Sequence, residues 1–535
     1  MLPVGSKIDT IFTDFFEKKA IFATSSTHTD NTMKRAIRLL LLATFALTLS
    51  ASAQTYRNPI LGGDYPDPTV VRDGADYYMT HSAFDYQPGL TVFHSRDLVH
   101  WEPISCALRT YLGSIWAPDI SKYGDKFYIY FTVALPRGRK NFVTWADSPY
   151  GPWSDPIDLH IANIDPCHVV GEDGTRWLFL SNGKRARLTD DGLAIVPGTE
   201  ETVYAGWPYP SDWVTEGFCL EGPKLRKIGD YYYYLNAEGG TAGPPTSHMI
   251  TVARSRSIDG PWENSPYNPL VHTYNNSDRW WSKGHGSLID TPDGRWWVVY
   301  HSYENGFYNL GRQTLLEPVE RTPDGWFKTC DETDIAGEIA APLPFDTAAP
   351  DRYAHLDEFR VGLEWKFYKN YDPARVTVGD RSVTLRSVGT DMVTSPPMLF
   401  VAGQHAYEVE ARVTLEGDVT AGICLYYNGG FFMSTGFDAL HRIRHRMGIE
   451  RGGGRHAQPI HNTLWLRIRN DRHIVTGAYS YDGVTWTNET WGMDISGYHH
   501  NTLYDFQSVL PGLFVYGDGA ARFDSLKFTL LPTNP

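Results

Sequence analysis

Three carboxylates in the sequence stand in similar settings that suit acid–base chemistry. Asp67 and Asp165 each precede a proline, and Glu221 precedes a Gly-Pro step. Hydrolysis of a glycosidic bond needs one protonated acid for the leaving oxygen and one ionised carboxylate near the anomeric carbon. Clustered carboxylates raise at least one pKa by like-charge repulsion, which keeps that acid protonated near neutral pH. Acids that cap strands or bind a structural cation are the alternative, but the repeated setting favours hydrolysis.

The elements that must position these acids form a repeat of five units. Each unit begins with a polar residue, continues as a short strand, turns at a glycine and ends in an aromatic strand such as the four tyrosines at 231–234. The five leading residues, 46 to 64 positions apart, are Asp67, Asp119, Asp165, Glu221 and His285. A sheet-rich unit that repeats at roughly 40–50 residues or slightly more is typical of a β-propeller blade. Five units predict five blades, whose inner strands bring the leading residues to one channel.

A second repeated sequence motif supports the prediction of blades, and the loss of the repeat further along the chain indicates a second domain. Three segments end a strand with a turn and a tryptophan: 95–101, 146–153 and 255–262. Three prolines between positions 342 and 350 then interrupt the pattern. Further on, alternating segments predict β-strands without the repeat, at 376–385, 407–415 and 464–469, with a hairpin at 480–486. We predict an all-β protein with a five-bladed β-propeller at 54–340, a linker at 341–352 and a β-sandwich at 353–535.

The first 53 residues are predicted to be a leader and signal peptide rather than part of the fold. Residues 34–38 form a basic segment, residues 39–49 are apolar, and residues 51–53 form a small-residue cleavage site. The apolar run is too short to span a bilayer. Met33 is predicted to be the true start, with a cytoplasmic leader as the alternative. Because no cysteine follows the apolar segment, we expect a secreted or periplasmic protein without a membrane anchor.

The composition narrows the range of partners. The formal net charge of −14 at pH 7 argues against nucleic acid and anionic membrane surfaces. Tyrosine and tryptophan are abundant, with 32 and 17 residues, which suits both blade packing and stacking on sugar rings. The five cysteines lack the spacing of metal ligands, so buried thiols are expected, with a disulfide between Cys167 and Cys219 as the alternative. We expect no organic cofactor.

Several short motifs occur in order across residues 55–330: D-Y-P-D-P-T, I-W-A-P-D-I, I-D-P, L-E-G-P-K-L, A-E-G-G-T, K-G-H-G-S-L-I-D-T-P-D-G and L-G-R-Q-T. Together they resemble glycoside hydrolase family 43, whose β-xylosidases and α-L-arabinofuranosidases are inverting five-bladed propellers. The C-terminal part resembles the concanavalin-A-like sandwich that follows the propeller in the family's β-xylosidases. The resemblance implies Asp67 as general base, Glu221 as general acid, and Asp165 as the residue that tunes the acid's pKa and orients it.

The resemblance also implies residues that bind the substrate and an ion. Trp116 resembles the aromatic wall of the sugar subsite, and Arg312 resembles the arginine that binds a sugar hydroxyl. Phe84 and Thr241 resemble further lining of this subsite. His285 resembles the histidine that holds a hydrated calcium or sodium ion in the channel. The alternatives are blade packing for Trp116, a surface salt bridge for Arg312, and a neutral, hydrogen-bonded core residue for His285.

Two further features lie near the fourth and fifth leading residues. The loop at 205–213 and the pair Trp280-Trp281 are rich in aromatic side chains. They are predicted to rise over the channel mouth, either as a rim that selects the substrate or as simple loop packing. Glu216 lies five residues before Glu221 but lacks the Gly-Pro context, so it is predicted to be a loop residue.

These observations predict an exo-acting, inverting glycosidase that releases xylose from plant-wall xylan or xylo-oligosaccharides. An α-L-arabinofuranosidase acting on arabinose side chains is the first alternative, since such enzymes share the propeller and often the sandwich. A non-catalytic carbohydrate-binding propeller is another, but it would be expected to lack one of the three acids. A retaining, fructosyl-transferring propeller needs carboxyl groups that lie closer together.

Overall fold

The computed structural model describes residues 54–330, 333–345, 351–357, 359–369 and 372–532. The predicted leader at 1–53 lies outside the described residues, as does the part of the predicted linker at 346–350. Residues Thr55–Pro535 cluster as one compact unit, so the propeller and the C-terminal domain contact each other extensively. None of the helices in the described part of the chain is long and apolar enough to cross a membrane.

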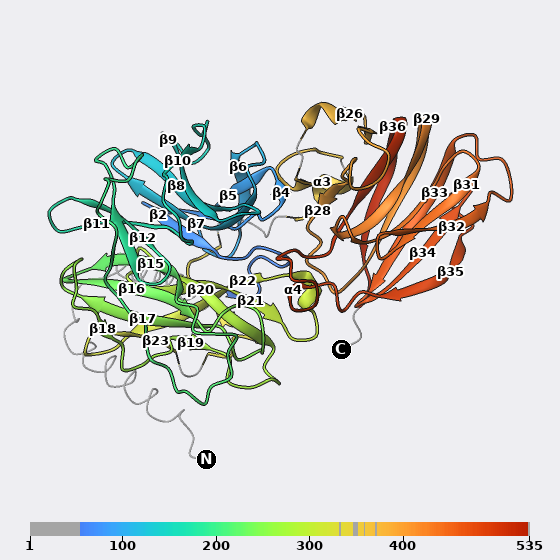
Figure 1. Ribbon diagram of the computed structural model, residues 1–535. Coiled ribbons are helices and arrows are strands. Elements are labelled where there is room, and N and C mark those ends of the chain that lie inside the picture. Colours follow the sequence, from blue (N-terminus) through green and yellow to red (C-terminus); the bar gives the residue numbers. More distant parts are fainter. Residues whose placement is uncertain (1–53, 331–332, 346–350, 358, 370–371, 533–535) are drawn as a thin grey trace, which may run out of the picture. The chain divides into compact units, whose positions relative to one another are not determined.

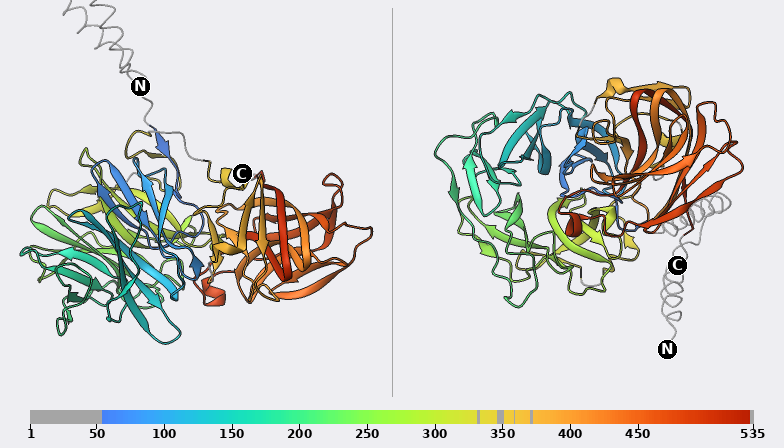
Figure 2. Two further views of the ribbon diagram at one scale, coloured as in Figure 1. Left: turned by 90° about the horizontal axis from the view of Figure 1, so that it is seen from above. Right: turned by 45° about the vertical axis from the view of Figure 1, so that its right-hand side comes forward.

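Five antiparallel sheets form the blades of the predicted propeller, which is confirmed (Figures 1 and 2). The first blade contains β2 (Thr69–Asp73), β3 (Asp76–Thr80), β5 (Gly89–Ser95) and β6 (Glu102–Leu108). The second contains β7 (Ser114–Tyr123), β8 (Lys126–Ala134), β9 (Arg139–Ala146) and β10 (Ile157–Asp158). The third contains β11 (Cys167–Val170), β12 (Arg176–Leu180), β13 (Lys184–Arg187) and β14 (Glu201–Thr202). The fourth contains β15 (Glu221–Ile228), β16 (Tyr231–Glu238), β17 (Met249–Ser255), β18 (Glu263–Asn264) and β19 (Val271–His272). The fifth contains β20 (Trp280–Asp290), β21 (Trp296–Glu304), β22 (Gln313–Arg321) and β23 (Phe327–Thr329), with the 3₁₀ turn η2 (Tyr308–Leu310) before β22.

The run of tyrosines in β16 shows why these sequences form blades. Tyr233 packs into the core shared with the fifth blade, whereas Tyr232 and Tyr234 pack into the core shared with the third. Side chains alternate between the two faces of a strand, and here both faces are covered by neighbouring blades. Burial of one large apolar side chain contributes about 1.5–3 kcal/mol. The turn before β16 uses Gly229 at a φ of 61°, a conformation that glycine adopts without a steric penalty.

The ring of blades is closed by the first segment of the propeller. The strand β1 (Thr55–Tyr56) pairs with β24 (Ile339–Ala340), which follows the fifth blade. Leu61 forms an isolated bridge with Thr314 of β22, and the side chain of Asn58 bonds to the backbone of Leu316 in both directions at 2.9 Å. The chain just before Asp67 is therefore held against the last blade.

The C-terminal domain forms the predicted β-sandwich. Its helices are α3 (Ala354–Asp357) and α4 (His500–Leu503), with the 3₁₀ turn η3 (Pro373–Arg375). Its strands are β25 (Trp365–Tyr368), β26 (Val376–Gly379), β27 (Ser382–Arg386), β28 (Met398–Phe400), β29 (Ala406–Asn428), β30 (Phe431–Phe437), β31 (His441–Arg446), β32 (Ile449–Arg455), β33 (Thr463–Asp471), β34 (Ile474–Ser480), β35 (Thr487–Asp494) and β36 (Leu510–Leu530). The segment 376–385 forms the hairpin β26–β27 rather than one strand.

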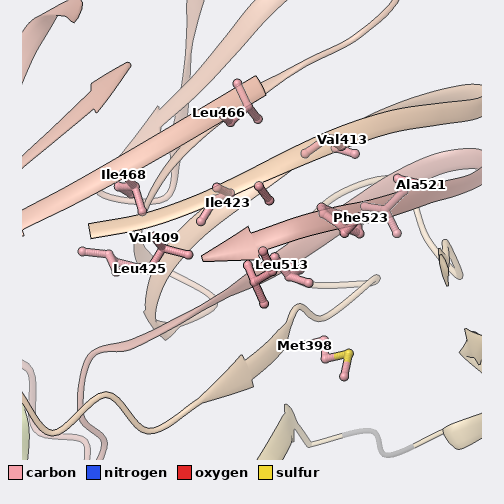
Figure 3. Packing of buried hydrophobic residues seen from close by; sticks show 14 of the residues in the cluster. Met398, Val409, Val413, Ile423, Leu425, Leu466, Ile468, Leu513, Ala521 and Phe523 are labelled. Carbon is pink, nitrogen blue, oxygen red and sulfur yellow. The ribbon is translucent and has the colours of Figure 1, made fainter. Parts of the chain in front are cut away.

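Two long strands organise the sandwich. β29 and β36 pair with each other from Tyr407 opposite Leu530 to Tyr426 opposite Leu510. Their apolar side chains pack with those of the neighbouring strands β33 and β28 in the main core (Figure 3). Both strands pass glycines with positive φ, Gly417 at 108° and Gly517 at 109°, so the strands change direction without ending.

The propeller and the sandwich share a sheet. The short strand β4 (Tyr86–Gln87), in the connection between β3 and β5, pairs with β25. This pairing matters for the site, because Phe84 lies two residues before β4.

The alternative disulfide between Cys167 and Cys219 is not formed: both side chains are thiols, and that of Cys167 is buried.

Candidate active site

Four of the five leading residues meet in the channel. Asp67 lies two residues before β2, Asp165 lies two residues before β11, Glu221 begins β15 and His285 lies within β20. The Nδ1 atom of His285 is 3.5 Å from Asp67 Oδ1. Its Nε2 atom is 3.8 Å from Glu221 Oε1 and 4.0 Å from Asp165 Oδ2. The three acids selected from the sequence therefore surround one imidazole ring.

Irregular backbone aims these side chains into the channel. Asp67, Asp165 and His285 have positive φ angles of 55°, 59° and 51°, in the left-handed region that residues other than glycine rarely adopt. The pairing of β15 with β16 is shifted just after Glu221, and that of β20 with β21 is shifted on both sides of Gly284. Bulges of this kind turn side chains out of the regular alternation. Strained backbone clusters where function fixes the geometry.

Asp67 is held as an ionised carboxylate. Arg312 donates to its two oxygens from Nη1 at 3.0 Å and Nη2 at 3.5 Å, and the Ser82 hydroxyl donates to Oδ2 at 2.5 Å. Burial alone would raise the pKa of Asp67, but the charges of Arg312 and His285 hold it well below its usual range. A buried carboxylate with these partners is ready to accept a proton at neutral pH.

Asp165 is linked to Glu221 by backbone as well as by charge. The backbone N–H of Gly222 donates to Asp165 Oδ2 at 2.9 Å, and the N–H of Asp165 donates to Thr132 Oγ1 at 3.0 Å. Burial raises the pKa of Asp165 to about 7, and the charge of Glu221 adds to this effect. The Glu221 side chain is 19% exposed, against 5% for Asp67 and for Asp165, so Glu221 is the most open of the three.

Three buried histidines stack on one another beside the acids. The ring centroids of His248, His285 and His301 lie 5.3–5.6 Å apart. The N–H of Asp67 donates to His301 Nδ1 at 3.0 Å, and burial lowers the pKa of His301 to about 3, so this ring is neutral. Burial alone would lower the pKa of His285, but Asp67 and the other carboxylates raise it. The positive charge among the histidines is therefore concentrated on His285.

The resemblance implies a calcium or sodium ion near His285. The donor atoms around His285 do not fit direct binding of such an ion. Glu221, His248 and His285 each offer one ligand atom within 4.8 Å of the others. Hard cations such as calcium prefer cages of oxygen ligands, whereas imidazole suits transition metals. Moreover, both nitrogens of His285 face carboxylates. The calcium or sodium ion stays a prediction, and no catalytic step is assigned to it.

Asp119, the second leading residue, has a structural role. Lys224 Nζ donates to Asp119 Oδ1 at 3.0 Å, Thr69 Oγ1 donates to the same oxygen at 3.3 Å, and the N–H of His168 donates to Oδ2 at 3.0 Å. These partners belong to β15, β2 and β11, while Asp119 belongs to β7. One carboxylate thus joins four blades, which explains why its sequence setting resembles that of the other leading residues.

The residues predicted to bind the sugar gather beside Asp67. Arg312 is buried, which excludes a surface salt bridge, and its Nη1 lies 3.5 Å from Thr241 Oγ1. The guanidinium lies 5.3 Å from the centroid of the Phe84 ring. Trp116 is half-buried, and its indole N–H donates to Ser114 Oγ at 3.0 Å. Their contact with a sugar stays a prediction.

A ring from the sandwich completes this aromatic group. Phe506, in the loop between α4 and β36, stacks on Phe84 with centroids 5.6 Å apart and meets Trp116 edge-on at 5.9 Å. The Arg312 guanidinium lies 5.0 Å from the Phe506 ring, and His500 stacks on this ring at 3.7 Å. The sandwich therefore forms part of the wall of the predicted sugar subsite.

Sequence reasoning missed four residues of this site. They are Ser82, His248, His301 and Phe506. His301 carried a usable signal, because it is a polar residue inside the buried aromatic strand β21. Phe506 carried none, since it belongs to no repeat and lies in a different domain from the Phe84 and Trp116 rings that it contacts.

Comparisons with known proteins identify the family of the propeller residues. Residues 56–327 match the family described as "Glycosyl hydrolases family 43". The chain is 33% identical over 400 residues to a non-reducing end α-L-arabinofuranosidase of Bacteroides ovatus, across 70% of this chain and 73% of the relative. It is 30% identical over 485 residues to a xylan 1,3-β-xylosidase of a Vibrio species, across 81% of this chain and 90% of the relative.

Solved structures extend the likeness beyond the propeller. The crystal structure of a GH43 protein from Bacillus licheniformis aligns with a TM-score of 0.79 at 28% identity, covering 89% of this chain and all of that one. A xyloglucan-locus GH43 protein from Bacteroides ovatus aligns with a TM-score of 0.77 at 25% identity, covering 89% of this chain and all of that one. On the match of the family model to half of the chain, and on relatives matched over most of their length, this chain belongs to glycosyl hydrolase family 43.

Proposed function

We propose that this protein is an exo-acting, inverting glycosidase that removes terminal xylose from plant-wall xylan or xylo-oligosaccharides. One observation carries the proposal: Asp67 and Glu221 face opposite nitrogens of the His285 ring, at 3.5 and 3.8 Å. The two carboxylates therefore approach different nitrogens of one ring, which lets them lie as far apart as an inverting pair must. Inverting pairs lie roughly 6.5–9.5 Å apart to admit a water molecule, while retaining pairs lie at about 5–5.5 Å. The arrangement favours inversion over a retaining, fructosyl-transferring enzyme.

The contacts assign a role to each acid. Asp67, held ionised by Arg312, accepts a proton from a water molecule as the water oxygen bonds to the anomeric carbon. The bond from that carbon to the leaving oxygen breaks at the same time, and Glu221 donates a proton to this oxygen. Asp165 positions Glu221 by accepting the backbone N–H of Gly222, the residue that follows it. Water then returns both carboxyl groups to their starting states.

Exo action and a small terminal sugar are supported by the aromatic wall. Phe84, Trp116 and Phe506 pack against one another on the Asp67 side of the cluster, where Arg312 also lies. Such a wall leaves little room for a polysaccharide to continue past the reacting sugar. Glu221, the more exposed acid, then faces the leaving group.

Xylose is preferred because relatives named as β-xylosidases match across both domains, as in the Vibrio protein. The second candidate is an α-L-arabinofuranosidase acting on arabinose side chains, which the relative from Bacteroides ovatus favours. A non-catalytic binding propeller is disfavoured, because all three acids are present and in contact with one imidazole.

A panel of 4-nitrophenyl glycosides tests the proposal. We expect hydrolysis of the β-D-xyloside, or of the α-L-arabinofuranoside if the second candidate holds, and little turnover of hexosides, which carry an extra hydroxymethyl group toward the aromatic wall. Proton NMR of the first-formed sugar should show the anomer opposite to that of the substrate. A first-formed product of retained configuration would overturn the assignment of Asp67 as a base.

The pH profile of kcat/KM should fall on the alkaline side only, over the range in which the protein stays folded. Asp67 stays ionised because its pKa is held well below its usual range, so loss of the base sets no acid limb near pH 5. Loss of the Asp165 proton, whose pKa burial raises to about 7, should produce an alkaline limb near that pH, because the charge beside Glu221 then changes. Asp165→Asn should remove this limb, because the amide does not titrate. Asp119→Asn serves as the control, and a limb that persists in Asp165→Asn would contradict this assignment.

Export to the periplasm or medium rests on residues 33–53 alone and stays a prediction. N-terminal sequencing of protein secreted from its native host would test it, with a mature terminus near Gln54 as the expected result.

A further inference from the structure

A row of aromatic rings stands on the fourth blade, outside the cluster of acids. Phe218, Tyr209, Trp213 and His272 stack in that order with nearly parallel rings. Successive centroids lie 5.8, 6.3 and 4.5 Å apart, and the planes differ by 18°, 21° and 7°. Tyr274 meets His272 edge-on at 4.8 Å. We call these five residues the aromatic row.

The inner rings of the row are fixed, while two outer rings are open to water. The Tyr209 hydroxyl donates to the carbonyl of Gly217 at 3.1 Å, and His272 Nε2 bonds to the carbonyl of Thr246 at 2.9 Å. Phe218 is 46% exposed and Tyr274 is 63% exposed. Contiguous exposed aromatic surface on a folded protein marks a binding site more often than a packing need. The rigid stack presents these two rings with little loss of side-chain entropy on binding.

Both ends of the row are joined to the active site. Phe218 lies three residues before Glu221, and its carbonyl accepts the N–H of Gly239, two residues before Thr241. His272 lies in β19 opposite Met249, the residue after His248, which stacks on His285. The row therefore joins the connection that leads into the blade with the predicted acid to β19 of that blade, at the end where the site lies.

The opposite side of the site is closed. Phe84, Trp116 and Phe506 pack together beside Asp67 and Arg312, so a substrate chain has to leave on the side of Glu221. Glu221 protonates the leaving oxygen in the proposed reaction, and the sugars beyond that oxygen extend past its segment of the chain.

We propose that the aromatic row binds the leaving-group portion of the substrate, as successive neutral pentose units of a xylan-type chain, through Phe218 and Tyr274. This inference rests on the proposed function. Sugar rings have apolar C–H faces that pack on aromatic faces, and they carry no charge to be neutralised, which suits an aromatic row. The row makes the enzyme prefer oligosaccharides over short substrates without altering the chemistry at Glu221.

The test compares a long and a short substrate in Phe218→Ala/Tyr274→Ala. We expect kcat/KM for xylotetraose, divided by kcat/KM for 4-nitrophenyl β-D-xyloside, to fall about tenfold. The change should appear as a higher KM for xylotetraose, because the two lost aromatic contacts bind the ground state and the transition state equally. Phe218→Tyr/Tyr274→Phe keeps both rings and should keep the ratio. Tyr267→Ala removes an exposed tyrosine elsewhere on the fourth blade (41% exposed) and is the matched control. An unchanged ratio in the double alanine variant would overturn the inference.

A binding measurement separates this inference from the proposed function. Calorimetric titration of Glu221→Gln with xylotetraose should give an affinity about tenfold weaker when the two alanine substitutions are added. If the wild-type protein hydrolyses no pentoside but the affinity for xylotetraose still differs, the proposed function is wrong and the aromatic row is still a binding site for the pentose chain. Equal affinities overturn the row whatever the activity. A concentration-dependent dimer that only the double alanine variant loses, with equal affinities, would assign the row to a second copy of the chain.

Discussion

Replacing Asp67 with asparagine is expected to lower kcat for every substrate by about 10⁴-fold, the upper end of what general acid–base catalysis contributes. The amide has the shape of the carboxylate but cannot accept the proton of the attacking water. An activated leaving group does not help, because the missing step is on the side of the water. The measurement is kcat on xylobiose and on a 4-nitrophenyl glycoside, and both should fall together.

The matched control is Asp119→Asn. Asp119 is also a buried leading aspartate with a basic partner, Lys224, but its oxygens bond to three other blades and not to the cluster around His285. Removing its charge leaves Lys224 partly buried without its partner, so this variant should melt at lower temperature yet keep kcat within about tenfold of the wild type. Asp67→Asn with more than a tenth of wild-type activity, in a folded protein, would remove Asp67 from the reaction.

Replacing Glu221 with alanine should separate substrates by their leaving groups. On xylo-oligosaccharides, whose alcohol needs a proton to depart, we expect a loss of about 10²–10⁴-fold. On an aryl glycoside, whose phenolate departs with little help, the loss should be much smaller. The observable is the ratio of the two losses within one variant, which does not depend on the amount of active protein.

Glu216 provides the comparison for this variant. It lies five residues earlier in the same segment, and its side chain accepts the N–H of Ala242 at 2.8 Å, in keeping with its prediction as a loop residue. Glu216→Ala should therefore lower activity on both substrate classes by the same small factor. Equal losses on both classes for Glu221→Ala, together with an active Asp67→Asn, would mean that the acid and the base are reversed.

The propeller was predictable because its signals are local. Each blade needs only period-two alternation, a glycine turn and apolar faces on both sides, and all three lie within some 20 residues of each leading residue. The sandwich was harder to predict, since its strands extend past residues that usually end strands. The predicted strand at 407–415 continues to Asn428 as β29, because Gly417 adopts a φ of 108° within the strand without ending it.

From the sequence, the site could be predicted only where the neighbours of a residue along the chain indicate its role. Asp67 and Asp119 both lead a repeat unit, although only Asp67 precedes a proline, and the structure separates them further by the side chains that arrive from other blades: Arg312 for one, and Lys224 for the other. Phe506 lies more than 400 positions from Phe84 and meets it only because the sandwich packs against the first blade. Contacts of this kind depend on the packing of whole domains, which no local pattern in the sequence records.

The pairing of β4 with β25 has a consequence for how this protein can change through recombination. Phe84 and β4 lie in one connection of the first blade, and β25 and Phe506 lie in the sandwich, so the seam between the domains passes through the wall of the sugar subsite. A chimaera that combined this propeller with a relative's sandwich would place that relative's residue against Phe84, along with that relative's strand beside β4. If these rings line the predicted sugar subsite, the choice of sugar is inherited jointly by two gene segments. We then expect substitutions confined to the C-terminal half to shift this choice while every carboxylate remains in place.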